Sequence, residues 1–246
     1  VMLGRFWQRR YGLPEGVMLE LDNLHRLDAR IPTVLFSHAN YTRDVSGSWD
    51  ARPELHDRRT VLLVRDPIDT AVSQYFQWKK VLNGYPPHGA DVSLFEFVMD
   101  ERCGLPAIVD YLAVFERELP KIRAHTVVAY EAMRADAATA LRQVLGFLGQ
   151  DPTDAEIADA VAFGSIENMR AMEQAGAAGF LGRRMRPGSA DPQSFKTRRG
   201  KVGGWRDQLT GDEIAAVEAW VRARAPLPFG YAITPVQADR IEETAP

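Results

Sequence analysis

Three short runs of consecutive apolar residues predict buried β-strands. They are Thr33–His38, Thr60–Arg65 and His125–Tyr130, and each is apolar throughout its middle. Runs of this kind are typical of parallel strands that helices cover on both faces. Each run ends on a polar or aromatic side chain, and ligands of parallel sheets bind beyond the carboxyl ends of the strands. The three strand ends are therefore the first place to look for a site.

Helical patterns fill the stretches between these runs. Asp66-Pro67 predicts a helix start, with a capping carboxylate before a proline in the first turn, and the helix is expected to reach Leu82. Two capping boxes, Thr153 with Glu156 and Thr210 with Glu213, predict two further helices. The alternation of strands and helices predicts an α/β fold in which a central parallel sheet is flanked by helices.

One segment, Gly176–Lys201, shows no apolar period. It is rich in glycine and carries one acidic residue, Asp191, against seven basic ones: Arg183, Arg184, Arg186, Lys196, Arg198, Arg199 and Lys201. We expect residues 176–201 to form a long, mobile, basic loop, because segments of this length without periodic structure are often lids. Its cations predict that it becomes ordered when a polyanionic ligand binds.

Composition narrows the class of protein. The 246 residues, of which 46% are hydrophobic and 26% charged, predict a single globular domain over 1–246. The net charge of −3 argues against a nucleic-acid partner. Cys103 is the only cysteine, which suits a reducing compartment and predicts a cytoplasmic location. No apolar run approaches the ~18 residues of a membrane span. No histidine or cysteine spacing predicts a metal site. A homo-oligomer is compatible with the sequence.

Arg65 and Ser73 together predict a phosphate clamp. Arg65 leads directly into a helix start, where backbone N–H groups and the helix dipole attract anions. Ser73, two turns into that helix, offers a hydroxyl donor. The alternative is a structural role, in which Arg65 pairs with Asp66, Asp69 or another carboxylate.

The sequence around this clamp resembles a known family. The stretch TVLLVRDPIDTAVSQYF is similar to the motif with which sulfotransferases hold the 3′-phosphate of 3′-phosphoadenosine-5′-phosphosulfate (PAPS), and Arg65 and Ser73 occupy the matching positions. The later stretch RRGKVGGW resembles the Arg-Lys-Gly-x-x-Gly-x-Trp motif that cradles the same phosphate. Arg198, Arg199 and Gly200 match it, with Arg199 in place of the common lysine. Either motif alone would be weak, whereas both in this order are specific.

Two further stretches resemble the adenine site of the same family. VVAYEAM is similar to a strand that ends in Tyr-Glu-Asp, whose tyrosine contacts adenine, so Tyr130 takes that role and Ala132 departs from the pattern. SIENM resembles a segment that lines the adenine pocket. Ser165 and Met169 match there, while Ile166 replaces an aromatic residue.

His38 is the candidate catalytic residue. It ends VLFSH, which resembles the family's Lys-Thr-His, although Phe36 and Ser37 differ from that motif. The resemblance makes His38 the base, and an ordinary histidine pKa of ~6.5 allows it to accept a hydroxyl proton at neutral pH. The alternative is a strand-end histidine bonded to neighbouring backbone.

The family's loop for the 5′-phosphosulfate, similar to Pro-Lys-Ser-Gly-Thr-Thr-Trp, does not occur in this sequence. The opening VMLGRFWQRRYG looks like the helix that follows that loop, so we expect the loop and first strand to lie upstream of Val1. The resemblance implies a P-loop-like three-layer fold and a sulfotransferase that uses PAPS and no metal. It would release adenosine 3′,5′-bisphosphate and act on a hydroxyl or amine of a small molecule.

Other readings stay open at this point. The chain is alternatively a non-catalytic protein that binds 3′-phosphoadenosine nucleotides. A nucleoside-phosphate kinase would need a Gly-x-x-x-x-Gly-Lys-Ser/Thr loop, which is not evident, and a nucleic-acid binder would need aromatic residues among its cations. Five aromatic residues near the motifs either line an acceptor pocket or belong to the core: Tyr41, Trp49, Tyr75, Phe76 and Trp78.

Overall fold

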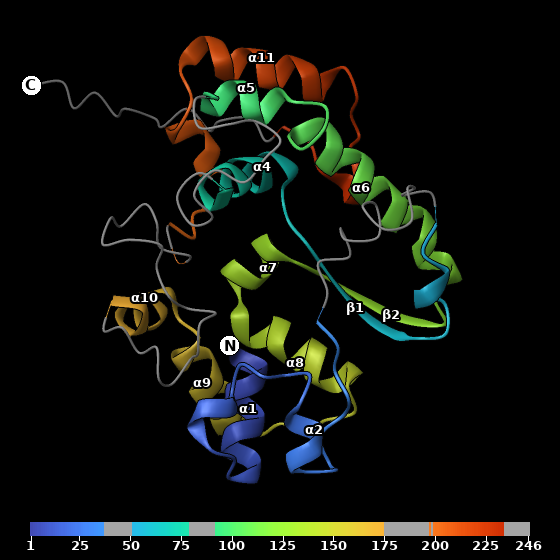
Figure 1. Cartoon of the computed structure of the whole chain (residues 1–246), viewed down its shortest axis with the longest axis vertical. Coiled ribbons are helices and arrows are strands. Elements are labelled where there is room, and N and C mark those ends of the chain that lie inside the picture. The colour runs from blue at the N-terminus through green and yellow to red at the C-terminus, as the bar shows by residue number, and fades with distance from the viewer. Residues whose placement is uncertain (37–50, 79–91, 175–196, 198, 234–246) are drawn as a thin grey trace, which may run out of the picture.

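A parallel pair of strands lies at the centre of the computed structural model, which describes residues 1–36, 51–78, 92–174, 197 and 199–233 (Figure 1). The strands are β1 (Arg59–Val64) and β2 (Ala124–Ala129). They pair in parallel from Arg59 opposite Ala124 to Val64 opposite Ala129. Parallel neighbours require a crossover, and helices supply it. They are α4 (Pro67–Phe76), α5 (Leu94–Met99) and α6 (Leu105–Glu118).

Helices gather on both sides of these strands (Figure 1). The crossover helices lie with α11 (Gly211–Arg222) on one side. On the other side lie α1 (Met2–Tyr11), α8 (Ala137–Phe147) and α9 (Asp154–Phe163). The remaining α-helices of the described residues are α2 (Leu24–Leu27), α7 (Tyr130–Ala135) and α10 (Ile166–Gln174). The predicted α/β architecture with a helix-flanked parallel sheet is confirmed. None of the described helices combines the length and the apolar character that a membrane crossing needs.

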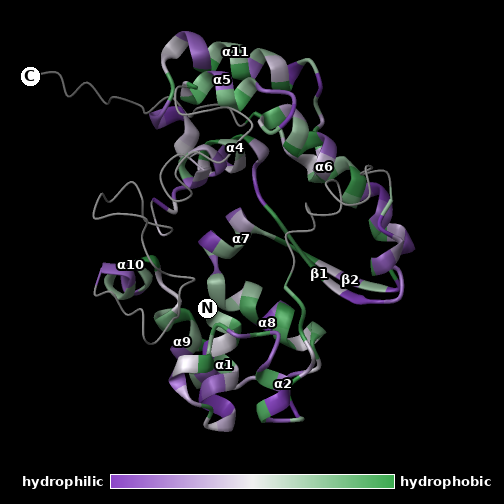
Figure 2. Ribbon diagram, in the orientation of Figure 1, coloured by the Kyte–Doolittle hydropathy of each residue, from purple (hydrophilic) through white to green (hydrophobic). Residues whose placement is uncertain are grey.

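Each helical layer has its own apolar core, and most helices carry both hydrophobic and hydrophilic residues (Figure 2). The core between α1, α8 and α9 contains buried Phe6, Trp7, Leu141, Leu145 and Ile157. The core between α4, α6 and α11 contains buried Ile68, Ala71, Val72, Leu105, Val217 and Val221. Trp205 belongs to this second core and is only 2% exposed. A fully buried aromatic side chain of this size contributes several kcal/mol, about 3–5 by truncation, so it holds the C-terminal glycine-rich motif against α4.

Most of the predicted elements are present. Both capping boxes form, at Thr153 with Glu156 and at Thr210 with Glu213. Asp66 caps α4, and both paired strands lie one residue earlier than predicted. The predicted helix end at Leu82 lies outside the described residues, as does most of the predicted basic loop.

One prediction is wrong. Thr33–Phe36, the described part of the predicted first strand, is not a strand. Leu35 and Phe36 are 75% and 54% exposed, and the Phe36 N–H donates to Asp22 Oδ1 at 3.3 Å. An apolar run becomes a strand only where a neighbouring strand pairs with its backbone groups. In the described ranges the only ladder joins β1 and β2, so the apolar pattern at 33–36 has no partner to complete it.

Candidate functional site

The register of the two strands places Arg65 beside Tyr130. Val64 pairs with Ala129, so the residues that follow the two strands, Arg65 and Tyr130, lie at the same edge of the sheet. The guanidinium carbon of Arg65 lies 4.5 Å from the centre of the Tyr130 ring, which is a cation–π distance. Nε of Arg65 is buried and has no hydrogen-bond partner among the described residues. A buried donor without a partner is uncommon, and the Arg65 side chain, which is 28% exposed, lines a pocket.

The start of α4 differs from the predicted anion site. The Asp66 carboxylate accepts the N–H groups of Ile68 and Asp69 at 2.9 and 2.8 Å, and the Asp66 carbonyl accepts that of Thr70. The backbone donors of the first turn are thus already satisfied, and an anion here has to bind the side chains. Burial raises the pKa of Asp66 to about 6, with Asp69 and Glu131 adding negative charge nearby.

Asp69 lies on the first turns of α4, one turn before Ser73 on the same face of the helix, and Arg65 lies two residues before the helix begins. The Asp69 side chain is nearly inaccessible, at 3% exposure. Oδ2 accepts the N–H of Gly203 at 2.7 Å, and Oδ1 accepts the N–H of Trp205 at 3.0 Å. The nearest guanidinium nitrogen of Arg65 is 3.9 Å from Oδ2. The alternative that Arg65 pairs with a carboxylate is therefore supported only by this long ion pair. Both Asp69 oxygens instead accept N–H groups of the glycine-rich turn.

The glycine-rich turn needs glycine at two points. Gly200 and Gly203 have φ values of 62° and 69°, in the left-handed region. A Cβ on Gly200 would lie 1.9 Å from Cδ1 of Ile166. The backbone of Gly200 can thus approach α10 and the Tyr130 hydroxyl only because the residue has no side chain.

Two cations flank Gly200 and share one carboxylate. Arg199 donates to Asp207 Oδ2, and Lys201 Nζ lies 3.0 Å from Oδ1 and 2.8 Å from Oδ2. These hydrogen bonds, from Lys201 first and then from Arg199, lower the pKa of Asp207. All three side chains remain about one-third to one-half exposed, so a stronger anion can reach them.

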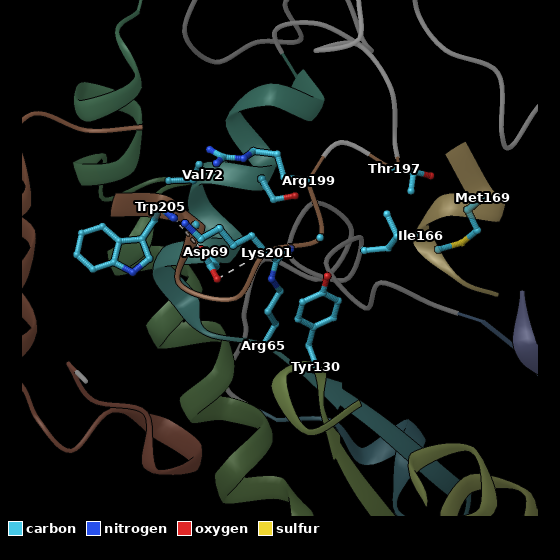
Figure 3. A pocket seen from close by; sticks show the side chains of 13 residues that line it. Arg65, Asp69, Val72, Tyr130, Ile166, Met169, Thr197, Arg199, Lys201 and Trp205 are labelled. Carbon is cyan, nitrogen blue, oxygen red and sulfur yellow. Dashed lines mark hydrogen bonds and ion pairs between the residues drawn. The ribbon is translucent and has the colours of Figure 1, made fainter. Parts of the chain in front are cut away.

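These elements enclose one pocket of about 300 Å³ (Figure 3). It brings together six residues that the sequence predicted for the site: Arg65, Ser73, Tyr130, Met169, Arg199 and Gly200. Ser165 is outside the lining. Its hydroxyl accepts the N–H of Asn168 at the start of α10. His38 and Arg198 lie outside the described residues.

The pocket is also lined by residues that the sequence did not predict for the site. The sequence indicated three of them only weakly. Lys201 and Trp205 belong to the RRGKVGGW stretch, and Asp69 lies four residues from both Arg65 and Ser73. The full additional lining is Asp69, Val72, Ile166, Thr197, Lys201, Gly204 and Trp205.

The aromatic residues considered for an acceptor pocket divide in two groups. Tyr41 and Trp49 lie outside the described residues. Tyr75 is buried against Phe97, with ring centres 5.5 Å apart, and its hydroxyl donates to the Val92 carbonyl at 3.3 Å. Phe76 and Trp78 pack on the same cluster, so these three belong to the core. In the described ranges, no three His, Cys, Asp or Glu side chains are grouped to hold a metal ion.

This chain is similar to known proteins of one family. A family model described as "Sulfotransferase domain" matches residues 50–227. Sulfotransferase 6B1 of Gorilla gorilla gorilla is 22% identical over 204 residues, which are 81% of this chain and 61% of that protein. The chain thus spans less than two thirds of the length of this curated relative.

Solved structures show the same fold. A mouse sulfotransferase complexed with PAP superposes with a TM-score of 0.52 at 20% identity, covering 67% of this chain and 57% of that one. Retinol dehydratase in complex with androsterone and inactive cofactor PAP superposes with a TM-score of 0.53 at 20% identity, covering 74% and 51%. Because the family model spans well over half of the chain and the fold agrees with it, the protein belongs to the sulfotransferase family.

Proposed function

We propose that this protein is an enzyme that transfers the sulfuryl group of PAPS to a hydroxyl or amine of a small molecule. One observation carries the proposal. Two segments far apart in the sequence, one with Arg65 and Ser73 and one with Arg199 and Gly200, meet in a single pocket beside Tyr130. Both segments are the ones whose sequences resemble the 3′-phosphate motifs of the family.

The residues present suit a 3′-phosphate. Arg65 offers a guanidinium whose side chain lines the pocket and is 28% exposed. Arg199 adds a second guanidinium, Ser73 a hydroxyl, and Gly200 a backbone that can approach closely. Charge-assisted hydrogen bonds from arginine to phosphate are among the strongest in proteins. We assign the 3′-phosphate to these four residues and to Arg198, which follows from its motif alone.

The adenine would lie against the apolar side of the pocket. Tyr130 offers the ring face that Arg65 does not cover, and Met169 and Ile166 line the same pocket from α10. Ser165 is retained as a candidate from its motif, although its hydroxyl already caps α10.

When bound, PAPS supplies the sulfuryl group. The residues of this chain hold the nucleotide by its 3′-phosphate and accept the proton of the acceptor hydroxyl. We assign proton removal to His38, on its motif and on the ordinary pKa of histidine. A cytoplasmic location, the absence of a nucleic-acid partner and a homo-oligomer remain predictions from the sequence.

Calorimetric titration tests the nucleotide site. We expect adenosine 3′,5′-bisphosphate, which is PAP, to bind at least ~100-fold more tightly than 5′-AMP, because only the former carries the 3′-phosphate. Equal affinities would contradict the proposal. Transfer of labelled sulfate from PAPS to a panel of phenols, alcohols and amines then separates an enzyme from a protein that only binds the nucleotide.

A further inference from the structure

Two buried carboxylates hold the segment that carries Arg199, Gly200 and Lys201, one on each side of it. Asp69 of α4 accepts the N–H groups of Gly203 and Trp205. Glu173 of α10, which is 1% exposed, accepts the N–H of Thr197 at 3.1 Å. The carbonyl of Thr197 in turn accepts from Arg170 Nε at 3.0 Å. The segment is thus fastened to two different helices.

The bonds of Asp69 are unusual for a buried carboxylate. Burying a carboxylate is unfavourable unless its oxygens are hydrogen-bonded. Here both oxygens accept backbone N–H groups from a turn remote in sequence, and Arg65 is no closer than 3.9 Å. Asp69 therefore links the half of the site on α4 to the half on the glycine-rich turn (Figure 3).

The turn needs such a link because its own conformation is unfavourable without one. Gly200 and Gly203 are both in the left-handed region, and glycine loses more conformational entropy on ordering than other residues. In addition, Arg199 and Lys201 have to lie near Arg65 around one pocket, and like charges repel. A site ordered before the ligand arrives avoids this loss at binding, which increases affinity.

We propose that Asp69 is a positioning residue that fixes the Gly203–Trp205 turn on α4 and so sets Arg199 and Gly200 opposite Arg65 and Ser73. The inference rests on the proposed function, since it takes the 3′-phosphate to be the ligand of these four groups. Asp69 itself does not contact that phosphate.

Asp69→Asn tests the role with almost no change in size. The amide oxygen of asparagine can still accept one of the two N–H groups, whereas its NH₂ opposes the other. We expect adenosine 3′,5′-bisphosphate to bind about 10- to 100-fold more weakly, and 5′-AMP to change by less than about 2-fold. The ratio of the two affinities should therefore fall. Amide hydrogen exchange at Gly203 and Trp205 should accelerate without any ligand.

Glu118→Gln is the matched control. Glu118 is also 1% exposed and also accepts a backbone N–H, from Arg52 at 3.1 Å, but it does not line the pocket. This variant should lower the free energy of unfolding and leave the affinity ratio unchanged. An equal loss of the ratio in both variants would reduce Asp69 to a general stabilising residue and overturn the proposal.

A second variant covers the case in which Asp69→Asn does not fold. Glu173→Gln loosens the other anchor, at Thr197, and should lower the same ratio by about 3- to 10-fold. A normal ratio in this variant would contradict the idea that anchoring the segment that carries Arg199 and Gly200 sets the phosphate site. If the wild-type protein does not prefer the bisphosphate to AMP, the proposed function fails. If the wild type prefers it and Asp69→Asn keeps the full preference, only the positioning role fails.

Discussion

The guanidinium of Arg65 stacks on the ring of Tyr130 because β1 and β2 pair in parallel with Val64 opposite Ala129. The two side chains belong to different motifs, and neither motif alone indicates that they touch. The contact holds the Arg65 side chain over an aromatic face while its Nε remains without a partner in the described chain. An arginine held in this way has already lost much of its rotamer freedom before an anion arrives.

Loss of the Arg65 side chain should weaken nucleotide binding. We expect Arg65→Ala to cost about 1.5–3 kcal/mol in the affinity for adenosine 3′,5′-bisphosphate, the loss of a charge-assisted hydrogen bond. The affinity of Arg65→Lys should lie between those of the wild type and Arg65→Ala, because lysine keeps the charge but neither the planar guanidinium nor the stacking on Tyr130. Arg142→Ala, which removes an exposed partner of Asp154 elsewhere, is the control. Unaltered affinity of Arg65→Ala in calorimetry would remove Arg65 from the site.

A methyl group on Gly200 should damage the site more than the fold. Gly200→Ala combines a left-handed φ with a contact of 1.9 Å to Ile166, whereas Gly12→Ala has a similar φ of 64° and open space around its Cβ. We expect both variants to lose about 1 kcal/mol or more of unfolding free energy from the backbone alone. Only Gly200→Ala should also lose bisphosphate affinity, by about 10-fold or more. Equal affinities of the two variants would show that the turn can shift without consequence.

Asp207 should compete with the ligand for its cations. It pairs with both Arg199 and Lys201 in the described structure, and a bound phosphate would have to draw them away. We therefore expect Asp207→Asn to bind adenosine 3′,5′-bisphosphate about 2- to 5-fold more tightly, the scale of an exposed ion pair. Asp154→Asn, which removes an exposed carboxylate outside the pocket, should bind as the wild type does. Weaker binding by Asp207→Asn would instead mean that Asp207 orients the two cations.

The raised pKa of Asp66 predicts a pH dependence of stability. Burial raises this pKa to about 6 from an ordinary value near 4, so between these pH values the folded protein keeps a proton that the unfolded chain releases. The contribution of Asp66 to the free energy of unfolding is then largest below about pH 4 and is lost as the pH rises to about 6. Compared with Asp66→Asn, which keeps the cap without the charge, the wild type should lose about 2–3 kcal/mol over this range. Urea unfolding of both proteins from pH 4 to 8 measures it, and a constant difference would contradict the assignment.

Replacement of His38 should separate binding from turnover. If His38 is the base, His38→Ala slows sulfate transfer from PAPS by ~10²–10⁴-fold and leaves bisphosphate affinity within about 2-fold of the wild type. Calorimetry and a radiolabelled transfer assay on the same preparation provide both numbers. Transfer at the wild-type rate would mean that a different group accepts the proton.

Much of the local structure could be predicted from sequence because local chemistry decides it. The caps at Asp66, Thr153 and Thr210 form as expected, since a side-chain acceptor needs only the N–H groups two or three residues away. The exception is Thr33–Phe36, where an apolar run has no strand beside it. Strand formation depends on a partner, and a pattern within one segment carries no information about that partner.

The sequence by itself determined the residue types of the phosphate clamp and their order, because the two motifs can be recognised without knowledge of the fold. Only the tertiary structure decided that Arg65 lies over Tyr130, that Asp69 accepts the N–H groups of Gly203 and Trp205, and that Asp66 satisfies the helix start. Strand register and the packing of Trp205 against α4 set these contacts. Both arise from interactions between segments distant in sequence, which spacing along the chain does not record.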